Sequence, residues 1–95
     1  MATIRAILIH PADDVAVVTE EAPEGATVSV QSPDGAANLV ARQIIPTGHK
    51  IAVHDTCCGK PVRKYGEKIG LAIQDIRAGD HVHLHNLASD RVKAP

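Results

Sequence analysis

Aromatic side chains are almost absent from this 95-residue sequence, which contains one Tyr, no Phe and no Trp. The hydrophobic core must therefore be built from Val, Ile, Leu and Ala. A chain of this length forms one domain with one small core. Such a core is only marginally stable without disulfides or metals. The composition thus favours a small β-rich body, or a subunit that gains buried area from a partner.

Long apolar runs and an excess of one charge sign are also missing. No run is long enough to span a bilayer, and the formal net charge of −1 favours neither nucleic acid nor an anionic membrane as a partner. Residues 1–5 lack the basic, apolar and cleavage regions of a signal peptide. We therefore expect a soluble, cytoplasmic protein.

The sequence has only two cysteines, and they are adjacent, Cys57 and Cys58. A disulfide between neighbours strains the intervening peptide and closes almost no loop, so it would add little stability. Two interpretations remain open. The thiols are either small loop residues before Gly59 or part of a soft metal site or redox switch, although the second pair that a zinc site needs is missing.

Short strand patterns fill most of the chain. Residues 4–9 and 15–18 are rich in aliphatic residues and flank a Pro-Ala-Asp-Asp turn, which predicts a hairpin. One pattern recurs three times: a turn residue, then Gly, then an alternating aliphatic strand. Its copies are residues 23–30, 46–53 and 77–84. The glycine of each copy is expected to adopt a positive φ.

The remaining segments complete a mostly β prediction. Residues 36–42 form a strand or a short helical turn, and residues 60–66 and 68–73 suggest two strands around a glycine turn. No window has a convincing helical period. We predict a compact, barrel-like or clip-like body over residues 1–87 and a polar tail or linker over residues 88–95.

Three histidines alternate with aliphatic residues near the C-terminus, as His81-Val82-His83-Leu84-His85-Asn86. In a strand these three side chains share one face, and the two aliphatic ones turn to the core. Imidazoles can ligate a metal, move a proton or bind an anion near neutral pH. A solvated polar strand face is the alternative interpretation.

Spacing alone does not complete a metal site on this segment. Side chains two residues apart along a strand lie about 7 Å apart, so two imidazoles can converge on one ion but three in line cannot. Further ligands would have to come from a partner chain or from elsewhere in this chain, where the candidates are Asp80, Asp75, His49 and His54.

Two cationic segments carry the other candidate residues. Gly48-His49-Lys50 opens one of the repeated strands, and Lys64-Tyr65-Gly66 places an ammonium and a phenol beside a turn glycine. Together with the imidazoles, these groups are suited to a small polyhydroxy carboxylate. Alternatively, both lysines are ordinary surface residues and Tyr65 is the one large core side chain.

The order of these motifs resembles a known family. Residues 45–52, 64–70 and 76–86, preceded by the hairpin that starts at His10-Pro11, resemble the N-terminal SAF domain of the altronate/galactarate dehydratase family, which also includes sulfolactate sulfo-lyase. The resemblance covers about residues 5–87. The Thr56-Cys57-Cys58-Gly59-Lys60 loop departs from the family, which more usually carries no cysteines there.

The resemblance implies a β-clip fold and a place in lyases that eliminate water, or in one branch sulfite, from small hydroxy-acids. It implies a small subunit that completes the active site of a large catalytic subunit, so the isolated chain would be inactive. It also implies a divalent metal, iron(II), mainly in that partner. Self-association is a further expectation. The alternative functions are sulfite release from sulfolactate and a non-catalytic module that binds sugar acids.

Site residues follow from the same resemblance, position by position. The expected catalytic residues are His81, His83 and His85, of which His83 and His85 would also contact a metal shared with the partner subunit. The expected substrate-binding residues are His49, Lys50, Lys64, Tyr65 and Asn86. Asn86 could instead orient a histidine.

Overall fold

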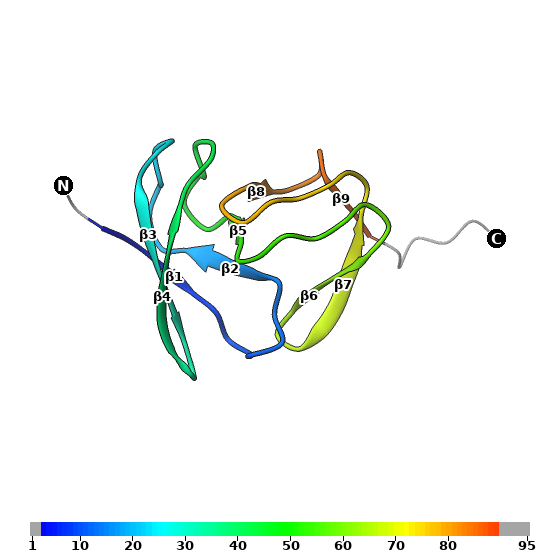
Figure 1. The fold of residues 1–95 in the computed structure, drawn as a ribbon, viewed down its shortest axis with the longest axis horizontal. Helices are drawn as coiled ribbons and strands as arrows, with labels where there is room; N and C mark the ends of the chain where they lie inside the picture. The colour runs from blue at the N-terminus through cyan, green and yellow to red at the C-terminus, as the bar shows by residue number, and fades with distance from the viewer. Residues whose placement is uncertain (1–2, 90–95) are drawn as a thin grey trace.

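The computed structural model describes residues 3–89, which form strands and turns and contain no helix, so nothing in this range is a helix that could cross a membrane. Six strands form one sheet in the order β4-β3-β1-β2-β5-β8, and three form a second in the order β6-β7-β9 (Figure 1). The strands are β1 (Ile4–Ile7), β2 (Val15–Val18), β3 (Thr27–Ser32), β4 (Gly35–Val40), β5 (Lys50–Ala52), β6 (Pro61–Lys64), β7 (Glu67–Ala72), β8 (His81–Val82) and β9 (Leu87–Ala88).

The predicted strands are largely confirmed. β1 and β2 pair antiparallel as the expected hairpin, and β1 also pairs in parallel with β3. Residues 36–42, which the sequence left open between strand and helix, lie mostly in β4 and pair antiparallel with β3. β6 and β7 form the second predicted hairpin. The mostly β fold class is therefore confirmed.

The glycine turn occurs four times, one more than the sequence pattern predicted. In every copy the residue two before the glycine accepts a hydrogen bond from the residue after it, and the glycine has a positive φ. This is the geometry of a type II turn, which strongly favours glycine at its third position. The glycines are Gly25, Gly48, Gly59 and Gly79, with φ of +86°, +79°, +89° and +94°.

The fourth copy explains the two cysteines. Cys57 and Cys58 are the first two residues of the turn that ends with Gly59 and Lys60. Both thiols are free and exposed. The loop interpretation of Cys57-Cys58 therefore agrees with the structure, which gives these thiols a place in a repeated backbone turn.

Each turn docks in the same way, on a strand in three copies and on the residue after β4 in the fourth. The glycine N–H donates to the carbonyl of a buried aliphatic residue, and the N–H of that residue donates to the carbonyl after the glycine. The buried partners of Gly25, Gly48, Gly59 and Gly79 are Ala41, Val18, Ala72 and Ala52 respectively. These paired backbone hydrogen bonds therefore connect every turn to a buried part of the chain.

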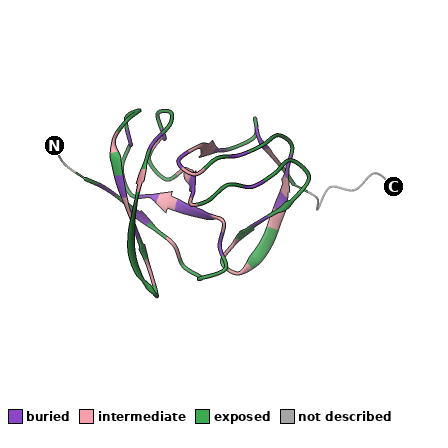
Figure 2. Ribbon diagram, viewed as in Figure 1, coloured by how far each residue is buried: buried purple, intermediate pink, exposed green. Residues whose placement is uncertain are grey.

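Two buried clusters share the central strands. One cluster contains Val18 and Ile51, and the other contains Val15 and Ala52. β2 and β5 therefore each contribute side chains to both clusters, and these strands lie at the middle of the molecule (Figure 2). Tyr65 belongs to neither cluster and is 57% exposed, so the expectation of a core tyrosine is wrong.

The predicted histidine strand is wrong beyond its first two residues. β8 ends at Val82, and residues 83–86 form a turn that leads into β9. Val82 is buried as expected, but Leu84 is 80% exposed at the turn. The side chain of Asn86 explains the difference, because it bonds to the backbone on both sides of Val82 and closes the turn.

The C-terminal boundary falls close to the predicted one. Ala88, which the sequence assigned to the tail, is the last residue of β9 and pairs with Leu71. Residues 90–95 of the predicted tail lie outside the described residues.

Alanine substitutions at two of the turn glycines should have unequal effects. At Gly59 a Cβ would meet open space, so only the positive φ opposes it, and we expect a loss of roughly 1 kcal/mol. At Gly79 a Cβ would also collide with the carbonyl oxygen of Val40, and we expect a loss of about 3 kcal/mol. Urea unfolding of Gly59→Ala and Gly79→Ala measures both. Equal losses would contradict a role for the Gly79–Val40 approach.

Candidate functional site

Three histidines at the ends of the neighbouring strands β5 and β8 meet at the edge of the six-stranded sheet. His49 Nδ1 lies 2.9 Å from His81 Nε2, and one ring nitrogen from each of His49, His81 and His83 lies within 4.8 Å of the others. The ring centroids are 5.1 Å apart for His49 and His81 and 4.8 Å apart for His49 and His83. The rings of His81 and His83 are stacked. These three residues are called the histidine cluster below.

The pairing of β5 with β8 brings His49 to this cluster. The two strands are antiparallel with Lys50 opposite Val82, so the register continued by one residue places His49 opposite His83. His49 follows Gly48 in its turn, and His81 follows Gly79 and Asp80 in another. Two of the four glycine turns therefore deliver the ring-bearing residues.

The third predicted histidine of the segment lies beside the cluster. The ring of His85 is 5.4 Å from that of His81, but His85 is not one of the three residues whose ring nitrogens converge. On the prediction from sequence, His83 and His85 contact the metal and His49 is only one possible further ligand. Among the described residues, the structure brings His49 and His81, not His85, next to His83. His54 lies elsewhere and pairs with Asp14.

Side chains outside the cluster hold its backbone in place. Asn86 is only 4% exposed; its Nδ2 donates to the carbonyl of His81, and its Oδ1 accepts from the N–H of His83. Gln43 Oε1 accepts from the N–H of His81, and Gln43 Nε2 donates to Asp80. Asn86 therefore acts on the histidines through their backbone. Gln43 was missed because it lies 38 residues from His81 and belongs to no motif.

Burial and neighbouring positive charge disfavour protonation of two groups here. Desolvation lowers the pKa of His81 below its usual 6.5, and the nearby histidines and Lys50 lower it further. Desolvation also lowers the pKa of Lys50 below its usual 10.5, with a smaller effect from Lys64. The site thus groups imidazoles with Lys50, and Lys64 is close enough to act on Lys50 electrostatically, which suits an anionic ligand.

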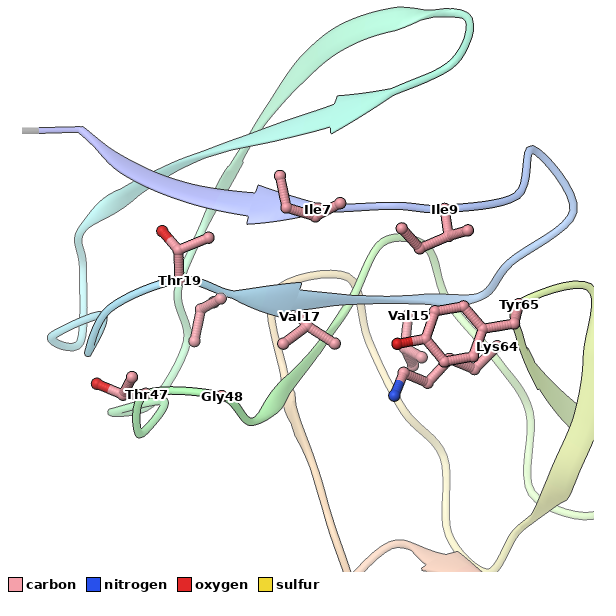
Figure 3. A pocket seen from close by; sticks show the side chains of 10 residues that line it. Ile7, Ile9, Val15, Val17, Thr19, Thr47, Gly48, Lys64 and Tyr65 are labelled. Atoms are coloured by element: carbon pink, nitrogen blue, oxygen red, sulfur yellow. The ribbon is translucent and has the colours of Figure 1, made fainter.

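Lys64 and Tyr65 line a groove to which Gly48, the residue before His49, also contributes. The groove has a volume of about 580 Å³, with Lys64 and Tyr65 at one end and Thr47 and Gly48 at the other (Figure 3). The ammonium of Lys64 lies 4.4 Å from the centroid of the Tyr65 ring, within range of a cation–π interaction. Of the predicted substrate-binding residues, His49 and Lys50 lie near the cluster, whereas these two lie at the groove.

A buried carboxylate fixes the turn that carries Tyr65. Asp13 is 3% exposed and accepts hydrogen bonds from the N–H groups of His10, Tyr65 and Gly66. These bonds hold Tyr65 at a φ of +57°, which a non-glycine residue seldom adopts. The sequence pattern predicts only that Asp13 lies in a turn. Its contacts lie 52 and 53 residues away, so no local pattern indicates them.

Comparison with known proteins gives one consistent family. Residues 4–90 match the altronate/galactarate dehydratase SAF domain. The chain is 45% identical over 80 residues to altronate dehydratase of Escherichia coli K12, which covers 84% of this chain but only 15% of that protein. It is 39% identical over 88 residues to (2R)-sulfolactate sulfo-lyase subunit alpha of Chromohalobacter salexigens, which covers 88% of this chain and 94% of that subunit.

The lowered pKa of His81 predicts a loss of stability in mild acid. The unfolded chain binds this proton more tightly, so stability is complete above about pH 6.5 and falls as the pH decreases towards the folded-state pKa. NMR titration of the ring protons should place the His81 midpoint below 6.5. Urea unfolding at pH 7 and pH 5 should show a smaller acid-induced loss in His81→Asn than in the unmodified chain. A His81 midpoint at or above 6.5 would contradict this expectation.

Proposed function

Because the chain belongs to the altronate/galactarate dehydratase SAF domain family, we propose that it is the small subunit of a hydroxy-acid lyase of that type. The subunit completes the active site of a separate large catalytic subunit. The complex is cytoplasmic and removes water from a sugar acid by β-elimination. The chain has no lyase activity by itself.

One observation carries the small-subunit proposal. The chain spans 94% of a relative that is named as a subunit, and the two are 39% identical. In contrast, it spans about a seventh of the length of altronate dehydratase, in which the same region is one part of a longer chain. The match to the sulfo-lyase subunit also favours a second candidate, in which the partner releases sulfite from sulfolactate.

The histidine cluster has one exposed member, His83, on an exposed turn, which is consistent with a shared active site. His83 and His85 are exposed, and Leu84 between them is an apolar side chain that solvent surrounds. A partner that covered this turn would bury Leu84 and bring its own groups to the imidazoles. We propose that these imidazoles face the substrate, where they move or hold a proton.

The two lysines supply the positive charge for a carboxylate. Lys50 is half-buried, and Lys64 is close enough to lower its pKa. We propose that Lys50 pairs with an anionic group of the substrate and that Lys64 and Tyr65 bind its polar end. Ammonium–carboxylate hydrogen bonds are shorter and stronger than neutral ones, which suits the recognition of a hydroxy-acid.

The complex is proposed to use a divalent metal, iron(II), held mainly by the large subunit. Imidazole nitrogen is a suitable ligand for iron and related ions, so the histidine cluster fits a contribution from this chain. A bound divalent ion would supply Lewis acidity that stabilises the charge formed when the proton next to the carboxylate is removed.

Purification of the tagged chain from its native host tests the function. We expect a protein of several hundred residues to copurify, because the family's catalytic domain would be a separate chain. The eluate should dehydrate altronate or galactarate; sulfite release from sulfolactate would instead select the second candidate. A chain recovered alone and inactive, yet stabilised by hydroxy-acids in a thermal-shift assay, would overturn the proposal in favour of a binding module.

Replacement of one exposed histidine should separate activity from assembly. His83→Ala should abolish the lyase activity of the reconstituted complex, because an imidazole would be lost from the active site. Assembly should be retained, since the side chain of His83 is exposed and supports no core contact. Activity is measured by product formation and assembly by size-exclusion chromatography.

A matched variant makes the His83→Ala result specific. His54→Ala also removes an imidazole, but from a site where His54 pairs with Asp14 outside the histidine cluster. We expect His54→Ala to keep the activity of the complex. Full activity in the His83→Ala complex would remove this histidine from the mechanism.

A further inference from the structure

The histidine cluster has the composition of a metal site that this chain could form without a partner. Within residues 3–89 it is the only set of three His, Cys, Asp or Glu residues whose ligand atoms converge within 4.8 Å. All three donors are imidazole nitrogens, and imidazole is the ligand that zinc, copper, iron and nickel share. Ca²⁺ and Mg²⁺ instead require oxygen ligands, so the donor set selects transition-metal ions.

The distances suit two ligands on one ion. Metal–nitrogen bonds of about 2.1 Å at right angles place two nitrogens about 3 Å apart, and a tetrahedral arrangement places them slightly farther apart. His49 Nδ1 and His81 Nε2 are already 2.9 Å apart. His83 is exposed, so its ring can rotate without disturbing the core. This rotation can bring its ring nitrogen closer to those of His49 and His81.

The backbone of the cluster is fixed before any ligand binds. Asn86 bonds to the backbone of His81 and His83, and Gln43 bonds to the N–H of His81. His49 is fixed by the turn at Gly48, whose N–H donates to Val18. Little backbone ordering would therefore oppose binding, which is the condition for a preorganised site.

We propose that His49, His81 and His83 form a binding site for one divalent transition-metal ion, held by this chain alone and open on its solvent side. Three protein ligands leave at least one position for water or for an oxygen of a small acid, as in catalytic zinc sites. Lys50 lies close enough to act on His81 electrostatically, so an anionic oxygen ligand on the ion would also neutralise its charge. This inference goes beyond the proposed function, in which the metal is held mainly by the large subunit, because it assigns an ion to this chain alone.

Metal titration of the isolated chain tests this site. The chain is prepared without a polyhistidine tag, stripped with a chelator and titrated with Zn²⁺ by calorimetry. We expect one ion per chain with micromolar affinity. Co²⁺ should give visible absorption bands typical of nitrogen ligation. Absence of Zn²⁺ binding at micromolar concentrations, or one ion shared by two chains, would overturn the proposal.

Variants identify the ligands. His49→Ala and His83→Ala should each weaken Zn²⁺ binding at least about tenfold. Replacing a residue that only supports a metal ligand already weakens metal affinity by about tenfold or more. His54→Ala should bind as tightly as the unmodified chain, because His54 lies outside the cluster. Equal weakening in all three variants, or none in His49→Ala, would contradict the assignment.

An NMR measurement on the unmodified chain avoids the question of whether a variant folds. Binding of Zn²⁺ should shift one ring nitrogen signal of each histidine in the cluster and leave those of His10 and His54 unchanged. Shifts confined to other histidines would overturn the site. A negative result would leave the lyase proposal intact, because that proposal is tested separately by copurification and product formation.

Discussion

The architecture depends on a repeated type II turn whose glycine adopts a positive φ that other residues seldom adopt. At four places this glycine donates its N–H to a buried Ala or Val on a neighbouring segment, and that residue returns a hydrogen bond to the turn. This exchange of hydrogen bonds connects each turn to a buried part of the chain, in a molecule whose core contains no aromatic side chain. In a chain with one exposed tyrosine, these paired hydrogen bonds and two aliphatic clusters hold the short strands together.

The candidate site is a direct consequence of these turns. The turns at Gly48 and Gly79 dock on Val18 of β2 and Ala52 of β5, and these two strands pair with each other. His49 directly follows Gly48, and His81 follows Gly79 after one intervening residue, Asp80. The same turns that stabilise the fold therefore position two imidazoles 2.9 Å apart at its surface.

The family and the geometry give complementary information about function. Membership of the altronate/galactarate dehydratase SAF domain family connects the chain with dehydratases and a sulfo-lyase. The geometry supplies the chemistry for the proposed role, because it groups three imidazoles with Lys50 at the surface of this small body. A site this open lacks the walls that exclude water from most active sites. That incompleteness is the physical reason to assign catalysis to a complex.

The sequence by itself determined the mostly β fold, both hairpins, three of the four turns and the segment that carries His81 and His83. These features are local, because alternation of side chains and glycine at a turn act within a few residues. Only the tertiary structure decided that His49 joins them from 32 residues away, since strand pairing sets that contact. It also decided that Leu84 faces solvent, because the buried amide of Asn86 ends the strand by bonding to its backbone.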